Sequence, residues 1–97
     1  MTPAKAKITS AKVKGKKLTL KWKRIVKNTK GYQIGLKDKK SGMTRYVNVK
    51  QGSKATVTKV VKKLEKGRKY AIRVRAYNIV EGQKVYGAWS KAKVGKV

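Results

Sequence analysis

The sequence predicts an all-β protein, a seven-stranded antiparallel β-sandwich. Apolar residues alternate with polar or cationic residues in short runs, which is typical of strands that have one buried face. Polar segments, most of them containing glycine, separate these runs and predict turns. No stretch shows the 3.6-residue period of an amphipathic helix. Two packed sheets are therefore expected, and 97 residues suffice for one domain, expected to span residues 1–97.

The individual strands follow from the alternation. In the second, Leu18, Leu20 and Trp22 fall on one face between polar residues. In the sixth, every second residue from Tyr70 to Ala76 falls on the inward face. The seven expected strands cover residues 8–13, 18–23, 32–36, 43–49, 55–61, 70–77 and 89–97. A polar loop is expected over residues 78–86.

The fifth strand does not fit the alternation. Val57 and Val61 are expected to point inward, but this register also turns Lys59 inward and Val60 outward. Either a β-bulge resets the register, or the Lys59 side chain snorkels past the sheet edge into solvent. The sequence leaves both alternatives open.

Charge is the compositional outlier. Lysine and arginine total 29 and aspartate and glutamate total 3, which gives a net charge of +26. Arginine occurs only at positions 24, 45, 68, 73 and 75, so most of the excess is lysine. Lysine is a hydrated point charge without the bidentate fork of arginine. The composition therefore favours diffuse attraction to polyanions, or solubility alone, over sequence-specific recognition. The regular apolar alternation argues against disorder.

The residue types exclude most catalytic chemistry. The chain has no histidine and no cysteine, and its three carboxylates, Asp38, Glu65 and Glu81, are far apart in sequence. No glycine-rich phosphate loop follows a strand and opens a helix. We therefore expect no enzyme activity, no cofactor and no metal site. No apolar run approaches the ~20 residues of a membrane span, so no membrane insertion is expected. No signal peptide is recognised, and Met1 is expected to be the start residue of a domain excised from a longer chain.

A turn motif precedes the sixth strand. Leu64, Gly67 and Tyr70 follow one another at three-residue spacing, which is typical of a tyrosine corner. In such a corner the tyrosine hydroxyl bonds back to the backbone of the turn. This motif supports the prediction of a β-sandwich.

With these residues in order, the chain resembles a fibronectin type III domain over essentially its full length. The resemblance rests on Pro3, Trp22, Gly31-Tyr32-Gln33-Ile34, residues 64–70, Arg73-Val74-Arg75-Ala76-Tyr77 and Gly87-Ala88-Trp89-Ser90. It implies an immunoglobulin-like sandwich with Trp22 and Tyr32 in the core. It also implies termini at opposite ends, so that copies join head to tail. The loop over residues 78–86 lacks Arg-Gly-Asp, so no integrin site is implied. The richness in lysine is similar to that of repeats in surface proteins of Gram-positive bacteria.

One sheet face is the candidate binding surface. Arg73 and Arg75 point outward from the sixth strand, and Trp89 is expected beside them, where a guanidinium stacks on the indole. Basic residues between aromatic ones suit phosphate or sugar groups. The same ladder also serves to brace the sheet, and both roles stay open. The candidate polyanion-binding residues are Arg73, Arg75, Tyr77, Trp89, Lys91, Lys37 and Arg45.

The expected function is that of a non-enzymatic spacer or adhesion module in an extracellular or cell-surface protein. The expected partners are polyanions (cell-wall teichoic acid, acidic glycans or nucleic acid), bound without specificity, and neighbouring domains of a tandem array. The domain itself is expected to be a monomer. The alternative is an engineered or supercharged scaffold whose charge serves solubility or stability. A dedicated nucleic-acid binder needs a basic stripe on one face, and the even scatter of lysine along the chain argues against it.

Overall fold

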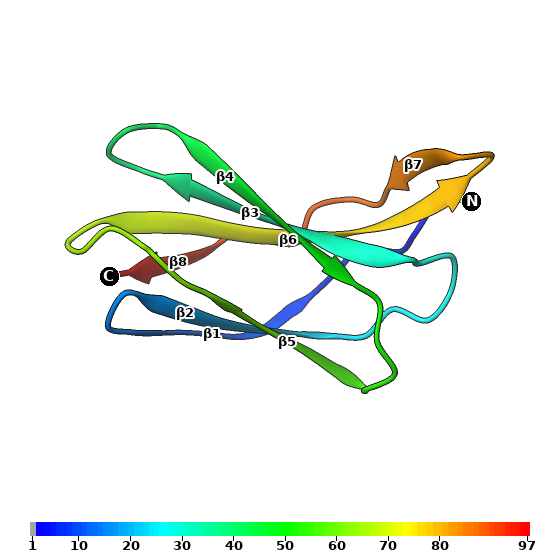
Figure 1. Cartoon of the computed structure of the whole chain (residues 1–97), viewed down its shortest axis with the longest axis horizontal. Helices are drawn as coiled ribbons and strands as arrows, with labels where there is room; N and C mark the ends of the chain where they lie inside the picture. The colour runs from blue at the N-terminus through cyan, green and yellow to red at the C-terminus, as the bar shows by residue number, and fades with distance from the viewer. Residues whose placement is uncertain (1) are drawn as a thin grey trace.

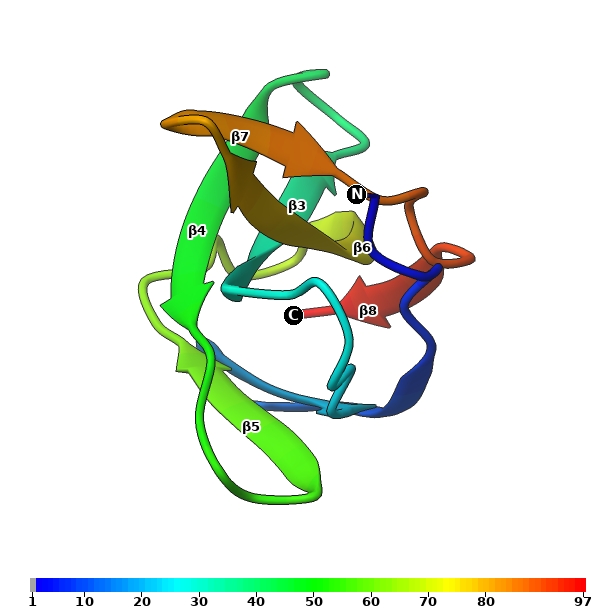
Figure 2. The same cartoon turned by 90° about the vertical axis from the view of Figure 1, so that its right-hand side faces the viewer.

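The computed structural model describes residues 2–97; Met1, the expected start residue, lies outside the described residues. Two antiparallel sheets pack face to face (Figures 1 and 2). Their strands are β1 (Ile8–Lys14), β2 (Lys17–Lys23), β3 (Gly31–Asp38), β4 (Thr44–Lys50), β5 (Thr56–Val61), β6 (Lys69–Val80), β7 (Gln83–Tyr86) and β8 (Lys93–Lys96). The predicted all-β sandwich is confirmed, with eight strands in residues 2–97 where seven were expected.

The two layers differ in size. The smaller sheet has the order β1-β2-β5, and the larger has the order β4-β3-β6-β7, with β8 also paired to β6. In Figure 1 the smaller sheet forms the lower layer, and β6 crosses the centre of the larger one. Each sheet has one inner face on the core and one outer face, because side chains alternate along every strand.

The core lies between the sheets and contains the residues that the alternation places inward. Trp22 and Tyr32 are fully buried, with ring centroids 5.2 Å apart in an edge-to-face arrangement. The Tyr32 hydroxyl accepts a hydrogen bond from the amide of Ile25 and donates one to Gln51 Oε1. Gln51 Nε2 in turn donates to the carbonyl oxygen of Ile25. This closed network satisfies polar groups where the chain enters β3.

The turn before β6 has the geometry of a tyrosine corner. The backbone amide of Glu65 donates a 2.9 Å hydrogen bond to the Tyr70 hydroxyl. Leu64 and Tyr70 are both buried. The corner therefore ties the crossover from β5 to the first core residue of β6.

The end of the chain differs from the prediction. The expected loop over residues 78–86 is wrong, because β6 runs on to Val80 and forms a hairpin with β7. Glu81 and Gly82 form the two-residue turn with φ values of 52° and 79°, the left-handed conformation that matches the twist of a hairpin. The expected last strand is divided, because residues 87–92 form no regular strand before β8, although the amides of Gly87 and Ser90 still donate to the carbonyl oxygens of Ala76 and Val74 on β6. There the Ser90 hydroxyl accepts a hydrogen bond from the backbone amide of Val74, in place of a carbonyl oxygen of a neighbouring strand.

The fifth strand is regular, so the bulge alternative is wrong. Pairing between β2 and β5 is continuous, with Leu20 opposite Lys59 and Trp22 opposite Val57. Lys59 is half-buried on the inner face, and Val60 is 41% exposed on the outer face. Because β5 lies at the sheet edge, the Lys59 side chain occupies the position expected of the snorkelling alternative.

The molecule is elongated, with principal extents of 41 × 26 × 20 Å. The two ends of the described chain lie at opposite ends of the long axis (Figure 1). In residues 2–97, no helix has the length and apolar character to cross a bilayer.

Candidate functional site

A ladder of aromatic and cationic side chains crosses the outer face of the larger sheet. At its centre the Arg75 guanidinium lies between two rings, 3.7 Å from the Tyr86 centroid and 4.3 Å from the Trp89 centroid. Arg75 Nε also donates a 2.9 Å hydrogen bond to Gln33 Oε1 on β3. Two cation–π contacts and one hydrogen bond fix this side chain across three segments, so Arg75 braces the sheet.

Further ring contacts extend the ladder in both directions. Trp89 lies 6.4 Å from Tyr46 of β4, measured between ring centroids. On the other side Tyr86 contacts Tyr77 edge to face at 6.3 Å. The Lys84 ammonium lies 4.9 Å from the Tyr77 ring centroid. The ladder thus joins β4, β6, β7 and the segment after β7.

Small residues on β3 make room for these rings. A Cβ atom built on Gly35 would stand 3.2 Å from Trp89 and 3.7 Å from Tyr46. The contact with the Trp89 indole would be closer than most Cβ contacts in proteins. A Cβ on Gly31 would meet the Tyr77 hydroxyl at 2.6 Å and the Val49 carbonyl oxygen at 2.5 Å. Glycine in a strand interior often marks such a close approach. Here it lets the Trp89 and Tyr77 rings approach the β3 backbone closely.

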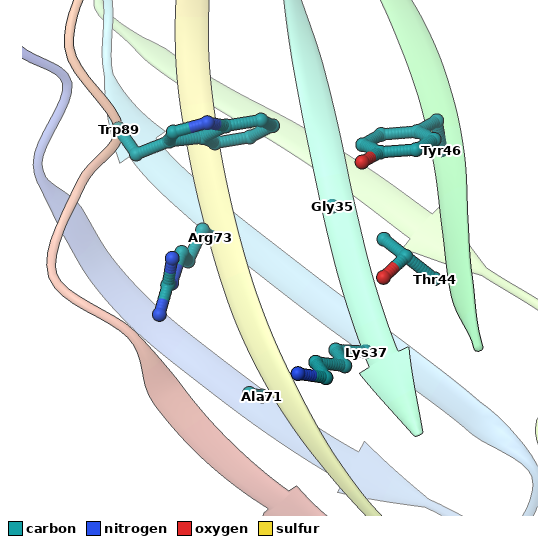
Figure 3. Close-up of a pocket in the computed structure, with 7 residues that line it drawn as sticks. All are labelled: Gly35, Lys37, Thr44, Tyr46, Ala71, Arg73 and Trp89. Atoms are coloured by element: carbon teal, nitrogen blue, oxygen red, sulfur yellow. The ribbon is translucent and has the colours of Figure 1, made fainter. Parts of the chain in front are cut away.

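A shallow hollow opens beside the ladder (Figure 3). Trp89 and Tyr46 face each other across Gly35, and Lys37 and Arg73 extend over the same face beside them. The hollow measures about 180 Å³. Its aromatic and cationic lining suits one anionic group of a larger ligand.

The structure brings together five of the seven candidate residues. Arg73, Arg75, Tyr77, Trp89 and Lys37 share the outer face of the larger sheet.

The other two candidate residues lie elsewhere. Arg45 sits opposite Leu36 in the pairing of β3 and β4, and its guanidinium donates to the carbonyl oxygen of Lys62. Lys91 lies by the N-terminal segment near Lys5 and Lys93.

Two of the three partners of Arg75, Tyr86 and Gln33, were not predicted from the sequence. Tyr86 was placed in a loop, and Gln33 was given no role. The signal for Tyr86 was the dipeptide Glu81-Gly82, because a two-residue turn that ends in glycine predicts a hairpin and so returns Tyr86 to the sheet. The sequence did not distinguish which of Arg73 and Arg75 stacks on the indole; of these two described residues, Arg75 lies over a ring.

One carboxylate carries a perturbed pKa. Asp38 is buried at the end of β3 and pairs with Arg68 across the sheet end. The hydrogen bond from the Arg68 guanidinium, assisted by the amides of Lys40 and Ser41, holds the pKa of the Asp38 carboxyl below its usual value. The same bond raises the pKa of Arg68. This pair fixes the turn after β3.

The remaining cations are almost all at the surface. Among the described residues, every lysine is exposed except the half-buried Lys59. Arg68 with Asp38 forms the one salt bridge found in residues 2–97. In the same residues no three side chains of the metal-ligating types His, Cys, Asp and Glu gather into a site. The surface is therefore suited to electrostatic association, with almost no internal neutralisation of its charge.

Comparison with known proteins places the chain in a family. The model of the fibronectin type III domain matches residues 2–91. The structure of a protein described as a myokine is similar at 17% identity, with a TM-score of 0.74 over 98% of this chain and 97% of that one. The FN5 domain of Drosophila Lar is similar at 19% identity, with a TM-score of 0.68 over 98% and 96%. A fibronectin type III domain of human collagen XX is similar at 20% identity, with a TM-score of 0.61 over 97% and 90%. No curated protein matches this sequence.

The chain belongs to the fibronectin type III family. Domains of this family are generally non-catalytic modules. They typically lie in the extracellular parts of larger proteins, often in tandem arrays. At their low sequence identity, the three similar structures show a shared fold and no shared ligand.

Proposed function

We propose that this domain is a non-enzymatic spacer and adhesion module of an extracellular or cell-surface protein, and that its cationic surface associates with polyanions. The observation that carries the proposal is the net charge of +26 on 97 residues. Self-repulsion of this size destabilises a compact state. A polyanion in contact with the surface relieves that repulsion and gains from the release of its counterions.

Because most of the positive charge is carried by lysine, the surface favours a polyanion that is bound without sequence-specific recognition. Exposed lysine ammonium groups on flexible stems attract anionic groups without fixed geometry. Of the arginines that suit bidentate recognition, Arg75 is held between two rings and Arg68 is paired with Asp38. Cell-wall teichoic acid, acidic glycans and nucleic acid all present the required repeated anions.

Beside the aromatic ladder lies a smaller surface to which a ligand could bind. Arg75 and its rings brace the larger sheet, whereas Lys37 and Arg73 beside the hollow have no charged partner among the described residues. These two cations and the exposed edge of the Trp89–Tyr46 pair form the part of the candidate face that is open to a ligand.

The spacer role follows from the arrangement of the ends. The described chain ends lie at opposite poles of an elongated body, so linked copies extend rather than fold back (Figure 1). A domain of 41 Å then acts as one rigid unit of a longer array.

Binding at varied salt tests the proposal. Fluorescence anisotropy with labelled heparin and a labelled single-stranded oligonucleotide should show binding at ~50 mM sodium chloride. Log affinity should fall linearly with log salt, with a slope of ~0.7–0.9 per neutralised phosphate. Absence of binding to both probes at ~50 mM salt would overturn the proposal, and the charge would then serve solubility or stability.

A further inference from the structure

The outer face of the smaller sheet is lined by lysine and hydroxyl side chains. The pairing of β1 with β2 and of β2 with β5 places alternate residues of the three strands on this side. We call it the lysine–threonine face; it comprises Ser10, Lys12, Lys14, Lys17, Thr19, Lys21, Lys23, Thr56, Thr58 and Val60. These residues are scattered in the sequence, and the sheet topology gathers them.

The charge of this face has no internal compensation. None of β1, β2 and β5 contains an aspartate or glutamate. Lys14 and Lys17 lie directly opposite each other, an arrangement that destabilises a sheet. At the same end Lys16, Lys62 and Lys63 join them around a broad open basin. A local arrangement that costs stability without visible compensation is expected at functional sites.

The hydroxyl groups between the lysines are available to a ligand. Thr19, Thr56 and Thr58 make no side-chain hydrogen bond within the described residues. Lysine, serine and threonine side chains are groups that contact phosphate oxygens and position a nucleic acid without reading its sequence. The face thus combines point charges with short-range donors.

Aromatic side chains are missing from the lysine–threonine face. The aromatic residue of the three strands, Trp22, is fully buried in the core. Proteins that hold single-stranded nucleic acid through its bases stack them on exposed aromatic rings. This face offers no such platform, so a ligand bound here contributes its backbone alone.

We propose that the lysine–threonine face binds the backbone of a flexible single-stranded phosphodiester chain and does not recognise bases. The proposal rests on the proposed function and assigns the polyanion to one face. Three strands give a strip roughly 10 Å wide and, at six or seven residues per strand, roughly 20–24 Å long. A flexible chain can follow such a strip, whereas a rigid duplex touches a flat surface along a narrow line. Nucleic acid and base-free polyol phosphates share the required chemistry.

The other sheet is the weaker candidate for this ligand. Its central cation Arg75 is held by two rings and Gln33, and Lys84 lies over Tyr77. Those interactions hold these cations in fixed positions, whereas free lysine side chains can follow a flexible phosphate backbone. The lysines of β1 and β2 have no comparable interaction within the described residues.

Two matched variants test the assignment. The first changes Lys12, Lys14, Lys17 and Lys21 to glutamine on the lysine–threonine face. The control changes Lys50, Lys69, Lys93 and Lys96, exposed strand lysines of the larger sheet, to glutamine. Each variant loses four charges, and each removes one directly opposite lysine pair, Lys14 with Lys17 or Lys69 with Lys96. Thermal denaturation checks that both variants fold.

The probes are a fluorescent oligodeoxythymidylate of about 15 nucleotides, the abasic oligomer of equal length, and heparin. Because four lysine–phosphate interactions are removed, the salt slope of the first variant should be smaller by ~2.8. Between ~50 and ~200 mM salt, the affinity of the unmodified domain should therefore fall about 50-fold more than that of the first variant. The control should keep the slope of the unmodified domain, and the abasic oligomer should bind as well as the thymidylate.

Each of the other outcomes would refute a different part of the proposal. Equal losses of affinity in both variants would refute the assignment to this face and leave the general polyanion proposal standing. Failure of the abasic oligomer to bind would show that bases are recognised. Heparin binding that is much tighter than oligonucleotide binding at equal salt would replace the phosphodiester with a sulfated glycan. Failure of the unmodified domain to bind any probe would refute the proposed function itself.

Discussion

Removal of a single oxygen atom tests the tyrosine corner. In Tyr70→Phe the ring stays in its buried position, but the amide of Glu65 loses the acceptor that now lies 2.9 Å away. An intramolecular hydrogen bond contributes ~0.5–1.5 kcal/mol, and an amide left without a partner costs more. We therefore expect the free energy of unfolding to fall by about 1 kcal/mol or more. For a domain of this size, 1 kcal/mol corresponds to a decrease in Tm of roughly 4–8 °C.

Urea denaturation at pH 7 measures this change. The midpoint should fall while the m-value stays constant, because the surface exposed on unfolding does not change. Tyr46→Phe is the matched control: its ring is 57% exposed, and its hydroxyl makes no hydrogen bond within the described residues. The control should stay within ~0.5 kcal/mol of the unmodified domain. Equal stability of the two variants would refute the view that the hydroxyl ties the turn to the core.

Four further predictions concern the core, the glycine contacts, the ion pair and the net charge. Trp22→Ala should lower the free energy of unfolding by ~3–5 kcal/mol in urea denaturation, because the ring is fully buried; a decrease below ~1 kcal/mol would contradict its place at the centre of the core. Gly31→Ala should destabilise by ~1–3 kcal/mol through overpacking against Val49 and Tyr77, whereas Gly52→Ala, with open space around it, should not; similar effects would contradict the close approach. Because Arg68 lowers the pKa of Asp38 in the folded state, the contribution of this carboxylate to stability is complete above its unfolded pKa and is lost as the pH falls through its folded pKa. The difference in unfolding free energy between the unmodified domain and Asp38→Asn should therefore shrink below about pH 4. A constant difference from about pH 7 to about pH 3 would contradict the ion pair. The Tm should rise between ~0.01 and ~0.1 M sodium chloride as the Debye length falls from ~30 to ~10 Å, and a flat response in calorimetry would show that self-repulsion is unimportant.

The alternation of residues was sufficient to predict the sandwich and most of its core. A period of two identifies the inward set wherever one sheet face is buried, as at Leu18, Leu20 and Trp22. The same rule placed Lys59 inward, and the edge position of β5 explains how the strand accepts it. One error lies where the backbone departs from a regular strand. The Ser90 hydroxyl accepts the hydrogen bond that the Val74 amide would otherwise give to a neighbouring strand, and no periodic pattern in the sequence predicts this bond.

The candidate site was predictable only in part, because it depends on lateral contacts between strands. Outward positions of β6 follow from the sequence, so Arg73 and Arg75 were found. Which of them stacks depends on the hairpin that brings Tyr86 beside β6, and the loop assignment concealed this hairpin. The lysine–threonine face was concealed for the same reason. Its lysines are evenly scattered along the chain, and their concentration appears only once β1, β2 and β5 are paired.

The fold separates two requirements that conflict in the composition. A core needs apolar contact, while 29 cations need water and distance from one another. A two-sheet sandwich meets both, because each strand sends alternate residues to opposite sides, and the lysines of β1 and β2 occupy outward positions while the core stays apolar. The separation does not remove the repulsion; it concentrates like charges on flat faces. On the larger sheet, aromatic rings cover part of that charge from within the domain. On the smaller sheet nothing in the described chain does so, and this difference is the physical reason to look there for an external polyanion.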